Sequence, residues 1–291
     1  MILATLLLLQ GFSPETNAVM DRSKREAAAA RASNSAPVAP QPKLPMTPEM
    51  AAKFQACVDT ATGDPEAGIR FANAWRLDGG TFHARQCLGF AYANAERWAP
   101  AMVAFEQSAD EAERAGDIPS GARLWAQAGN AALASGDAAK ARTYFDAALA
   151  RGLPDGMEKG EAYLDRARTL VALGELGPAR ADLDVALDQA PKDPLAWLLS
   201  ATLARRAGQI GLAQQHIARA VQMSPDDASV ALEEGNIAVL SDHADVARSA
   251  WQRAVRLAPQ SIAGKAAADS LTRLDAKPAP AAPVKTTPQS R

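Results

Sequence analysis

Three prolines recur at a constant interval of 34 residues in the C-terminal half of the chain. They are Pro191, Pro225 and Pro259, and each opens a short polar stretch that follows an apolar one. Proline cannot continue the interior of a helix, so each of these stretches is predicted to be a turn. A turn that returns at a fixed interval indicates tandem units, each of which needs its neighbours to bury its apolar face.

Small and bulky side chains repeat in register with these turns. A central alanine is followed four positions later by a bulky residue and seven positions later by a small one, which places all three on one face of a helix. The central alanines are Ala67, Ala101, Ala141, Ala179, Ala213 and Ala247, at spacings of 34, 40, 38, 34 and 34. A small residue on a preceding helix lies twelve positions before five of them, at Gly89, Gly129, Ala167, Ala201 and Gly235. Because apolar residues make up 48% of the chain but aromatic residues only 5%, we expect helices that pack closely through small side chains.

The 34-residue period and the recurring positions of small and bulky residues resemble the tetratricopeptide repeat. The resemblance is fullest in "WLLSATLARRAGQIGLAQQHIARAVQMSPDD" (197–227) and is also clear in "CLGFAYANAERWAPAMVAF" (87–105). It implies an all-α, right-handed superhelical solenoid of about six helix–turn–helix units with a C-terminal capping helix. The expected units are 48–81, 82–121, 122–159, 160–193, 194–227 and 228–261, with the cap at 262–276. The first unit departs from the pattern, since Gln55 stands where a small residue is expected.

Two units are longer than 34 residues. The spacing of 40 adds six residues around "DEAERAGDIPSG", which predicts a lengthened second helix. The spacing of 38 adds four residues around "RGLPDGMEKG", which predicts a looser turn. Either both additions are neutral variation in loops, or they form a local contact site.

The two ends of the chain differ in composition from the repeats. Residues 2–9 form an apolar run, so residues 1–20 are predicted to be a secretory signal peptide, although the usual positive charge before the run is missing. The alternative is a short apolar tail in a cytoplasmic protein. Residues 21–46 and 277–291 are rich in alanine and proline and are predicted to be disordered linkers. The prediction is a periplasmic or secreted protein with no stable membrane insertion after removal of the signal.

The chain has two cysteines, Cys57 and Cys87, and lies in an oxidising compartment if it is exported. An even cysteine count together with export suggests a disulfide between the first two units. The alternative is two small buried thiols, because free cysteine often packs in a core.

Nothing in the sequence indicates catalysis. The 31 basic residues nearly balance the 33 acidic ones, with no basic stripe, so nucleic acid is not an expected partner. The three histidines, His83, His216 and His243, lie far apart, and no metal-binding, phosphate-binding or nucleophile motif is present in the sequence. We therefore predict no catalytic residues, no metal and no cofactor.

The resemblance implies that the first helices line a concave groove that receives a protein or peptide. The groove candidates are Phe90, Arg123, Asn130, Leu164, Arg168, Leu198, Thr202, Arg205, Leu232 and Asn236. The leucines form an apolar column with arginines between them, a mixture suited to a segment that carries carboxylates. The alternative is that the leucines are covered by neighbouring helices and the arginines form an ordinary solvated face. A co-chaperone role is not supported, because Ala126 and Leu232 stand one turn before Asn130 and Asn236, where that role requires lysine.

These features predict a non-catalytic scaffold that binds a partner protein through its groove. The alternative is an accessory subunit that positions a partner enzyme. The identity of the partner does not follow from the sequence.

Overall fold

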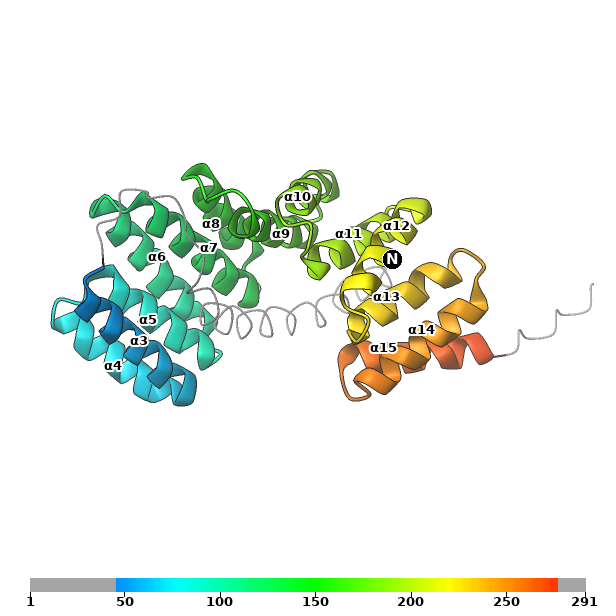
Figure 1. The fold of residues 1–291 in the computed structure, drawn as a ribbon, viewed down its shortest axis with the longest axis horizontal. Coiled ribbons are helices and arrows are strands. Elements are labelled where there is room, and N and C mark those ends of the chain that lie inside the picture. The colour runs from blue at the N-terminus through cyan, green and yellow to red at the C-terminus, as the bar shows by residue number, and fades with distance from the viewer. Residues whose placement is uncertain (1–45, 277–291) are drawn as a thin grey trace, which may run out of the picture. The chain divides into compact units, whose positions relative to one another are not determined.

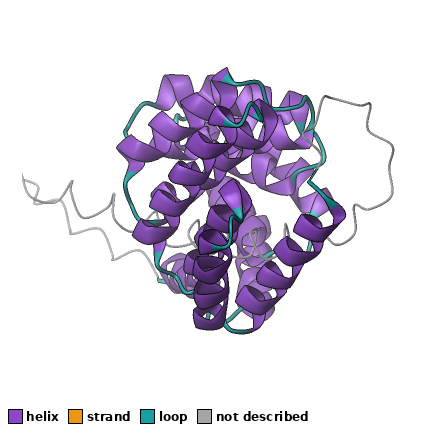
Figure 2. Cartoon of the chain, turned by 90° about the vertical axis from the view of Figure 1, so that its left-hand side faces the viewer, coloured by secondary structure: helices purple, strands orange, loops and turns teal. Residues whose placement is uncertain are grey.

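The computed structural model describes residues 46–276, and every regular element in that range is an α-helix (Figure 1). The predicted signal peptide 1–20, the linker 21–46 apart from Met46, and the tail 277–291 lie outside the described residues. Figure 2 shows helices joined by short turns, with no strand in the described part of the chain.

Thirteen helices follow one another in the described residues. First helices alternate with second helices, and the last helix stands alone. They are α3 (Pro48–Gly63), α4 (Pro65–Leu77), α5 (Thr81–Asn94), α6 (Trp98–Arg114), α7 (Ile118–Ala134), α8 (Ala138–Ala150), α9 (Met157–Ala172), α10 (Leu176–Gln189), α11 (Pro194–Arg206), α12 (Ile210–Met223), α13 (Ala228–Val239), α14 (Ala244–Leu257) and α15 (Ile262–Asp275). The chain therefore has the all-α architecture that its periodicity predicts.

The described residues divide into two compact bodies, one ending at Leu203 and the other beginning at Ala204. We call them the N-terminal body and the C-terminal body. The N-terminal body contains α3 to α10 and most of α11, and the C-terminal body contains the end of α11 and α12 to α15.

The helix ends follow local side-chain chemistry. Asp117 and Asp137 each cap a helix by accepting a hydrogen bond from the backbone N–H three residues later, at distances of 3.1 and 3.0 Å. Gly136 closes α7 in the left-handed region at φ 83°, where its N–H donates to the carbonyl of Leu133. Residues with a Cβ atom rarely adopt this conformation, which is why glycine ends this first helix.

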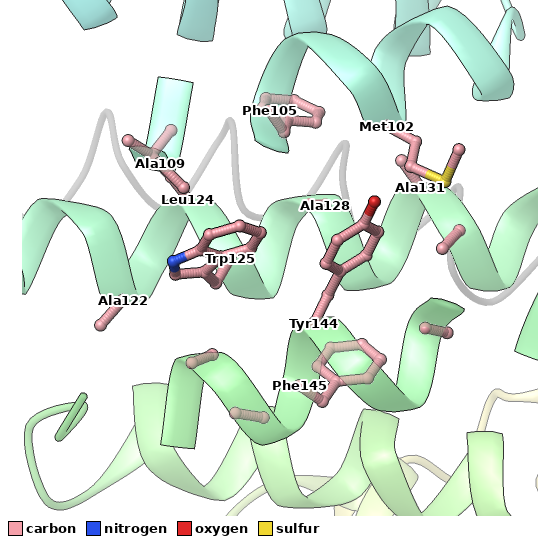
Figure 3. Packing of buried hydrophobic residues seen from close by; sticks show 14 of the residues in the cluster. Met102, Phe105, Ala109, Ala122, Leu124, Trp125, Ala128, Ala131, Tyr144 and Phe145 are labelled. Atoms are coloured by element: carbon pink, nitrogen blue, oxygen red, sulfur yellow. The ribbon is translucent and has the colours of Figure 1, made fainter. Parts of the chain in front are cut away.

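Small residues on first helices pack against aromatic rings on second helices. A Cβ atom on Gly129 of α7 would lie 2.8 Å from the Phe145 ring of α8, and one on Gly89 of α5 would lie 2.7 Å from the Phe105 ring of α6. The same relation joins Gly235 of α13 to Trp251 of α14. Figure 3 shows Phe145 beneath α7 with Trp125 and Tyr144 beside it. The small and the bulky residues that recur in the sequence therefore contact each other in the structure.

As predicted, the first insertion lengthens the second helix α6, and the second insertion gives a longer turn, residues 151–156, between α8 and α9. Helix α6 has 17 residues, whereas α4, α8, α10, α12 and α14 have 13 or 14. The first helix α7 is also longer than expected, with 17 residues against 14 in α5. The six added residues are therefore shared between a second helix and the following first helix, because Asp117 starts α7 early with its N-cap. Both insertions also meet in space: Arg151 after α8 pairs with Glu113 of α6, and Leu153 is buried in the core that contains Trp125.

Candidate functional site

The first helices α5 and α7 lie side by side in the N-terminal body. The amide Nε2 of Gln86 on α5 donates to Oε1 of Gln127 on α7 at 3.4 Å. Gly89 and Gly129 face the second helices. The residue after each glycine lies about 100° further around the helix axis, because an α-helix has 3.6 residues per turn. We call the surface formed on that side of α5 and α7 the α5–α7 face. Its half-buried residues are Gln86, Phe90 and Ala93 on α5 and Ala126, Gln127, Asn130 and Leu133 on α7.

Two of the predicted groove residues, Phe90 and Asn130, lie on this face. The Phe90 ring packs against the cores on both sides of α5 and remains half-buried. The side-chain oxygen of Asn130, Oδ1, is buried and accepts no hydrogen bond. A buried acceptor without a donor costs about 1–3 kcal/mol, and because this atom is buried, a partner on the surface cannot reach it without movement of the neighbouring side chains.

The predicted groove arginines are all paired with carboxylates of the protein itself. Arg123 on α7 donates two hydrogen bonds to Glu158 on α9, at 2.7 and 3.3 Å. Arg168 is 7% exposed and donates to Asp165 at 3.0 Å. In the C-terminal body, Arg205 donates to both oxygens of Glu233 at 2.6 and 3.2 Å.

That these arginines suit a partner segment with carboxylates stays a prediction, although all three pair with carboxylates of the protein itself. The repeat pattern places the arginines on their helices. It does not show that the carboxylates paired with Arg123 and Arg205 come from the next first helix, 35 and 28 positions later. Each guanidinium already has its counter-charge.

The predicted leucine column is also largely internal. Leu164 is fully buried in a core with Ala167 and Leu170, and Leu198 is only 9% exposed. These two residues are core residues and cannot form a wall for a partner, because the helices around them already cover them. Leu232 in the C-terminal body is half-buried against the core that contains Trp251. The hydroxyl of Thr202 donates to the carbonyl of Leu198 within α11.

Asn236 is held by contacts within the C-terminal body. Its Nδ2 donates to Glu233 at 3.1 Å, and its Oδ1 accepts from the Trp251 indole N–H at 3.2 Å. Both ends of the amide are thus used in the fold. The column position of Trp251 was visible in the sequence, but its hydrogen bond to Asn236 requires the packing of α14 on α13.

Glu113 of α6 connects the long helices α6 and α7 to the turn that follows α8. Its carboxylate accepts from the Trp125 indole N–H at 2.5 Å and pairs with Arg151, whose Nη2 lies 3.1 Å from Oε2. Burial raises the pKa of Glu113, but the hydrogen bonds from Arg151 and Trp125 outweigh this effect and leave the pKa below its ordinary value. Sequence reasoning did not identify this cluster, although it lies in the two insertions.

The other shifted groups also have structural causes. Burial lowers the pKa of His83, and nearby Asp117 and Glu111 oppose the shift only in part. Burial and a hydrogen bond with Glu106 raise the pKa of Tyr144. Among residues 46–276, no three histidine, cysteine, aspartate or glutamate side chains converge as a possible metal site. No helix in that range is both long and apolar enough to cross a membrane.

A disulfide joins Cys57 of α3 to Cys87 of α5 in the structure. The two sulfur atoms are 1.95 Å apart, the two Cα atoms are 6.3 Å apart, and both residues are fully buried. The bond connects the first helices of the first two repeats.

Helix pairs in tandem, joined by small residues set against bulky ones, define a helical-repeat protein. Residues 132–203 match the model of the tetratricopeptide repeat family. This segment of the chain is therefore similar to the tetratricopeptide repeat family, and the tandem helix pairs of the described residues agree with that similarity.

Solved structures with the same fold have low sequence identity to the chain. PilF of Pseudomonas aeruginosa has 15% identity and a TM-score of 0.60, with 76% of this chain and 99% of PilF covered. PilW, a widely conserved type IV pilus biogenesis factor, has 20% identity and a TM-score of 0.62, with 75% and 98% covered. A chain of the Cut9–Hcn1 complex has 14% identity and a TM-score of 0.63, with 78% and 43% covered. No curated protein matches the chain at a significant level.

Proposed function

We propose that this protein is a non-catalytic scaffold that binds a segment of a partner protein on its first helices. The observation that carries the proposal is the α5–α7 face. Phe90, Ala126 and Leu133 remain half-buried there. Partial exposure of apolar side chains on two neighbouring first helices favours a polypeptide segment as ligand, since a polypeptide can supply apolar contacts to both helices.

The proposal is tested by site-specific crosslinking in cells. A photo-crosslinking amino acid is placed at Leu133 on the α5–α7 face or, as a control, at Val103, which is 42% exposed on the second helix α6. We expect a defined partner to be crosslinked from position 133 and not from position 103. Equal yields of the same product from both positions would show that the α5–α7 face has no special role.

We also propose that the scaffold works outside the cytoplasm. The apolar run at residues 2–9 supports export, and the Cys57–Cys87 bond is of a kind that persists in oxidising compartments. The likeness to PilW, a type IV pilus biogenesis factor, is compatible with an envelope location. Fractionation of cells and determination of the N-terminus of the protein test this proposal. A cytoplasmic protein that keeps its N-terminal residues would instead support an intracellular adaptor.

A further inference from the structure

The helices α5 and α7 carry almost no charge. They contain 14 and 17 residues, and the only lysine, arginine, aspartate or glutamate residues among them are Arg85 and Arg123. Arg85 is paired with Glu111 of α6 at 2.8 Å, and Arg123 is paired with Glu158 of α9 at 2.7 Å. Burial keeps the pKa of His83 below its ordinary value, so this imidazole is also uncharged at neutral pH.

The neighbouring first helix is different. Within α9, from Met157 to Ala172, six residues are charged, namely Glu158, Lys159, Glu161, Asp165, Arg166 and Arg168. The low charge of α5 and α7 is therefore not shared by the next first helix, α9.

We propose that the partner segment bound on the α5–α7 face is uncharged and apolar and is held by contacts with Phe90 and Leu133. This inference rests on the proposed function and specifies the chemistry of the ligand. It replaces the acidic segment that the arginine positions alone suggested.

The electrostatics of the face favour such a segment over a charged one. A carboxylate or an ammonium group brought against Phe90, Ala126 and Leu133 would lose its hydration, and the α5–α7 face offers no unpaired counter-charge in return. An uncharged apolar segment loses little on leaving water and removes apolar surface from it.

The test is a peptide selection on the immobilised full-length protein. Random peptides of about a dozen residues are displayed on phage, and enriched sequences are synthesised for affinity measurements. Each peptide is measured against wild type, Ala126→Glu, Ala126→Gln and Val103→Glu. Ala126 is half-buried on the face, Ala126→Gln matches the size of the glutamate variant without its charge, and Val103→Glu places the charge on an exposed site of α6.

We expect enriched peptides with an uncharged apolar centre. They should bind Ala126→Glu at least about tenfold more weakly than wild type and should bind Ala126→Gln and Val103→Glu nearly as well as wild type. Replacement of a central apolar residue of the peptide by glutamate or lysine should weaken binding to wild type by a similar factor. Ala93→Glu on α5 serves the same purpose if Ala126→Glu does not fold.

Two results would overturn the inference, and only the second would also refute the proposed function. Peptides that depend on Ala126 but have aspartate and glutamate, or lysine and arginine, at their centre would refute an uncharged ligand and leave the binding scaffold intact. If no enriched peptide is weakened by Ala126→Glu or Ala93→Glu, the α5–α7 face does not bind polypeptide, and the proposed function fails together with the inference.

Discussion

Substitution of Gly129 by alanine tests the contact on which the repeat packing depends. Gly129 lies within α7 against the ring of Phe145, a residue with no exposed surface. A Cβ atom at this position would lie 2.8, 2.9 and 3.0 Å from three ring carbons. Ordinary contacts between carbon atoms are about 3.5–4.0 Å, so the ring or the helix would have to shift by roughly 0.7 Å.

Two opposing contributions set the size of the effect. Overfilling a packed core costs about 1–3 kcal/mol. Alanine in place of glycine in a helix interior contributes about 0.5–1 kcal/mol in the other direction, because the unfolded chain loses conformational freedom. We therefore expect Gly129→Ala to lower the free energy of unfolding of the N-terminal body by about 1–2 kcal/mol.

Unfolding by guanidinium, followed by circular dichroism and by tryptophan fluorescence, measures this difference. Gly177 in α10 is the matched control, since nothing lies within 4 Å of a Cβ atom there. Gly177→Ala should be neutral or stabilising by up to about 1 kcal/mol. Phe145→Leu should cost less in the Gly129→Ala background than alone, because the smaller side chain leaves room for the added methyl group. A Gly129→Ala protein at least as stable as wild type would refute the packing argument.

Two further predictions concern cross-links within the N-terminal body. The disulfide between Cys57 and Cys87 has a sequence separation of 30, so its loss in a Cys57→Ala/Cys87→Ala variant should destabilise this body by about 3–4 kcal/mol in the chain-entropy model. Mass measurement under non-reducing conditions checks the bond, and two free thiols in exported protein would contradict it. Glu113→Gln should cost about 1–2 kcal/mol at neutral pH, because Arg151 and Trp125 would lose a charged acceptor. The pKa of Glu113 is lowered in the folded state, so this contribution is fully present above the unfolded pKa near 4.5 and is lost progressively as the pH falls from there through the lower pKa of the folded state. An equal difference between the two proteins at acidic and neutral pH would show that the carboxylate charge is not responsible.

The helices could be predicted from the sequence because their signals are local. Gly129 and the residues on α8 that it faces recur in register with the other units, and offsets of four and seven define a helix face without any knowledge of tertiary contacts. The predicted unit boundary at 122 differs from the start of α7 at Ile118, since the N-cap of Asp117 adds a turn. This N-cap could be predicted from the sequence only if the six added residues were assumed to be helical.

The partner-binding residues were harder to predict. Phe90 and Asn130 lie on the α5–α7 face, whereas Leu164 is enclosed by the core and Arg123 is paired with Glu158. The position of a residue within the repeat specifies the direction of its side chain from the helix. It does not specify which neighbouring helix covers that side chain or supplies its counter-ion.

The sequence by itself determined the class of fold, the order of the helices and the recurring positions of small and bulky residues, because all three follow from periodicities within about 34 residues. Only the tertiary structure decided that the arginines are neutralised, that the two insertions join at Glu113 and Arg151, and that α5 and α7 together present an uncharged surface. The physical reason is that charge compensation and burial depend on pairs of residues from different helices, and a pattern along one helix contains no information about its partner.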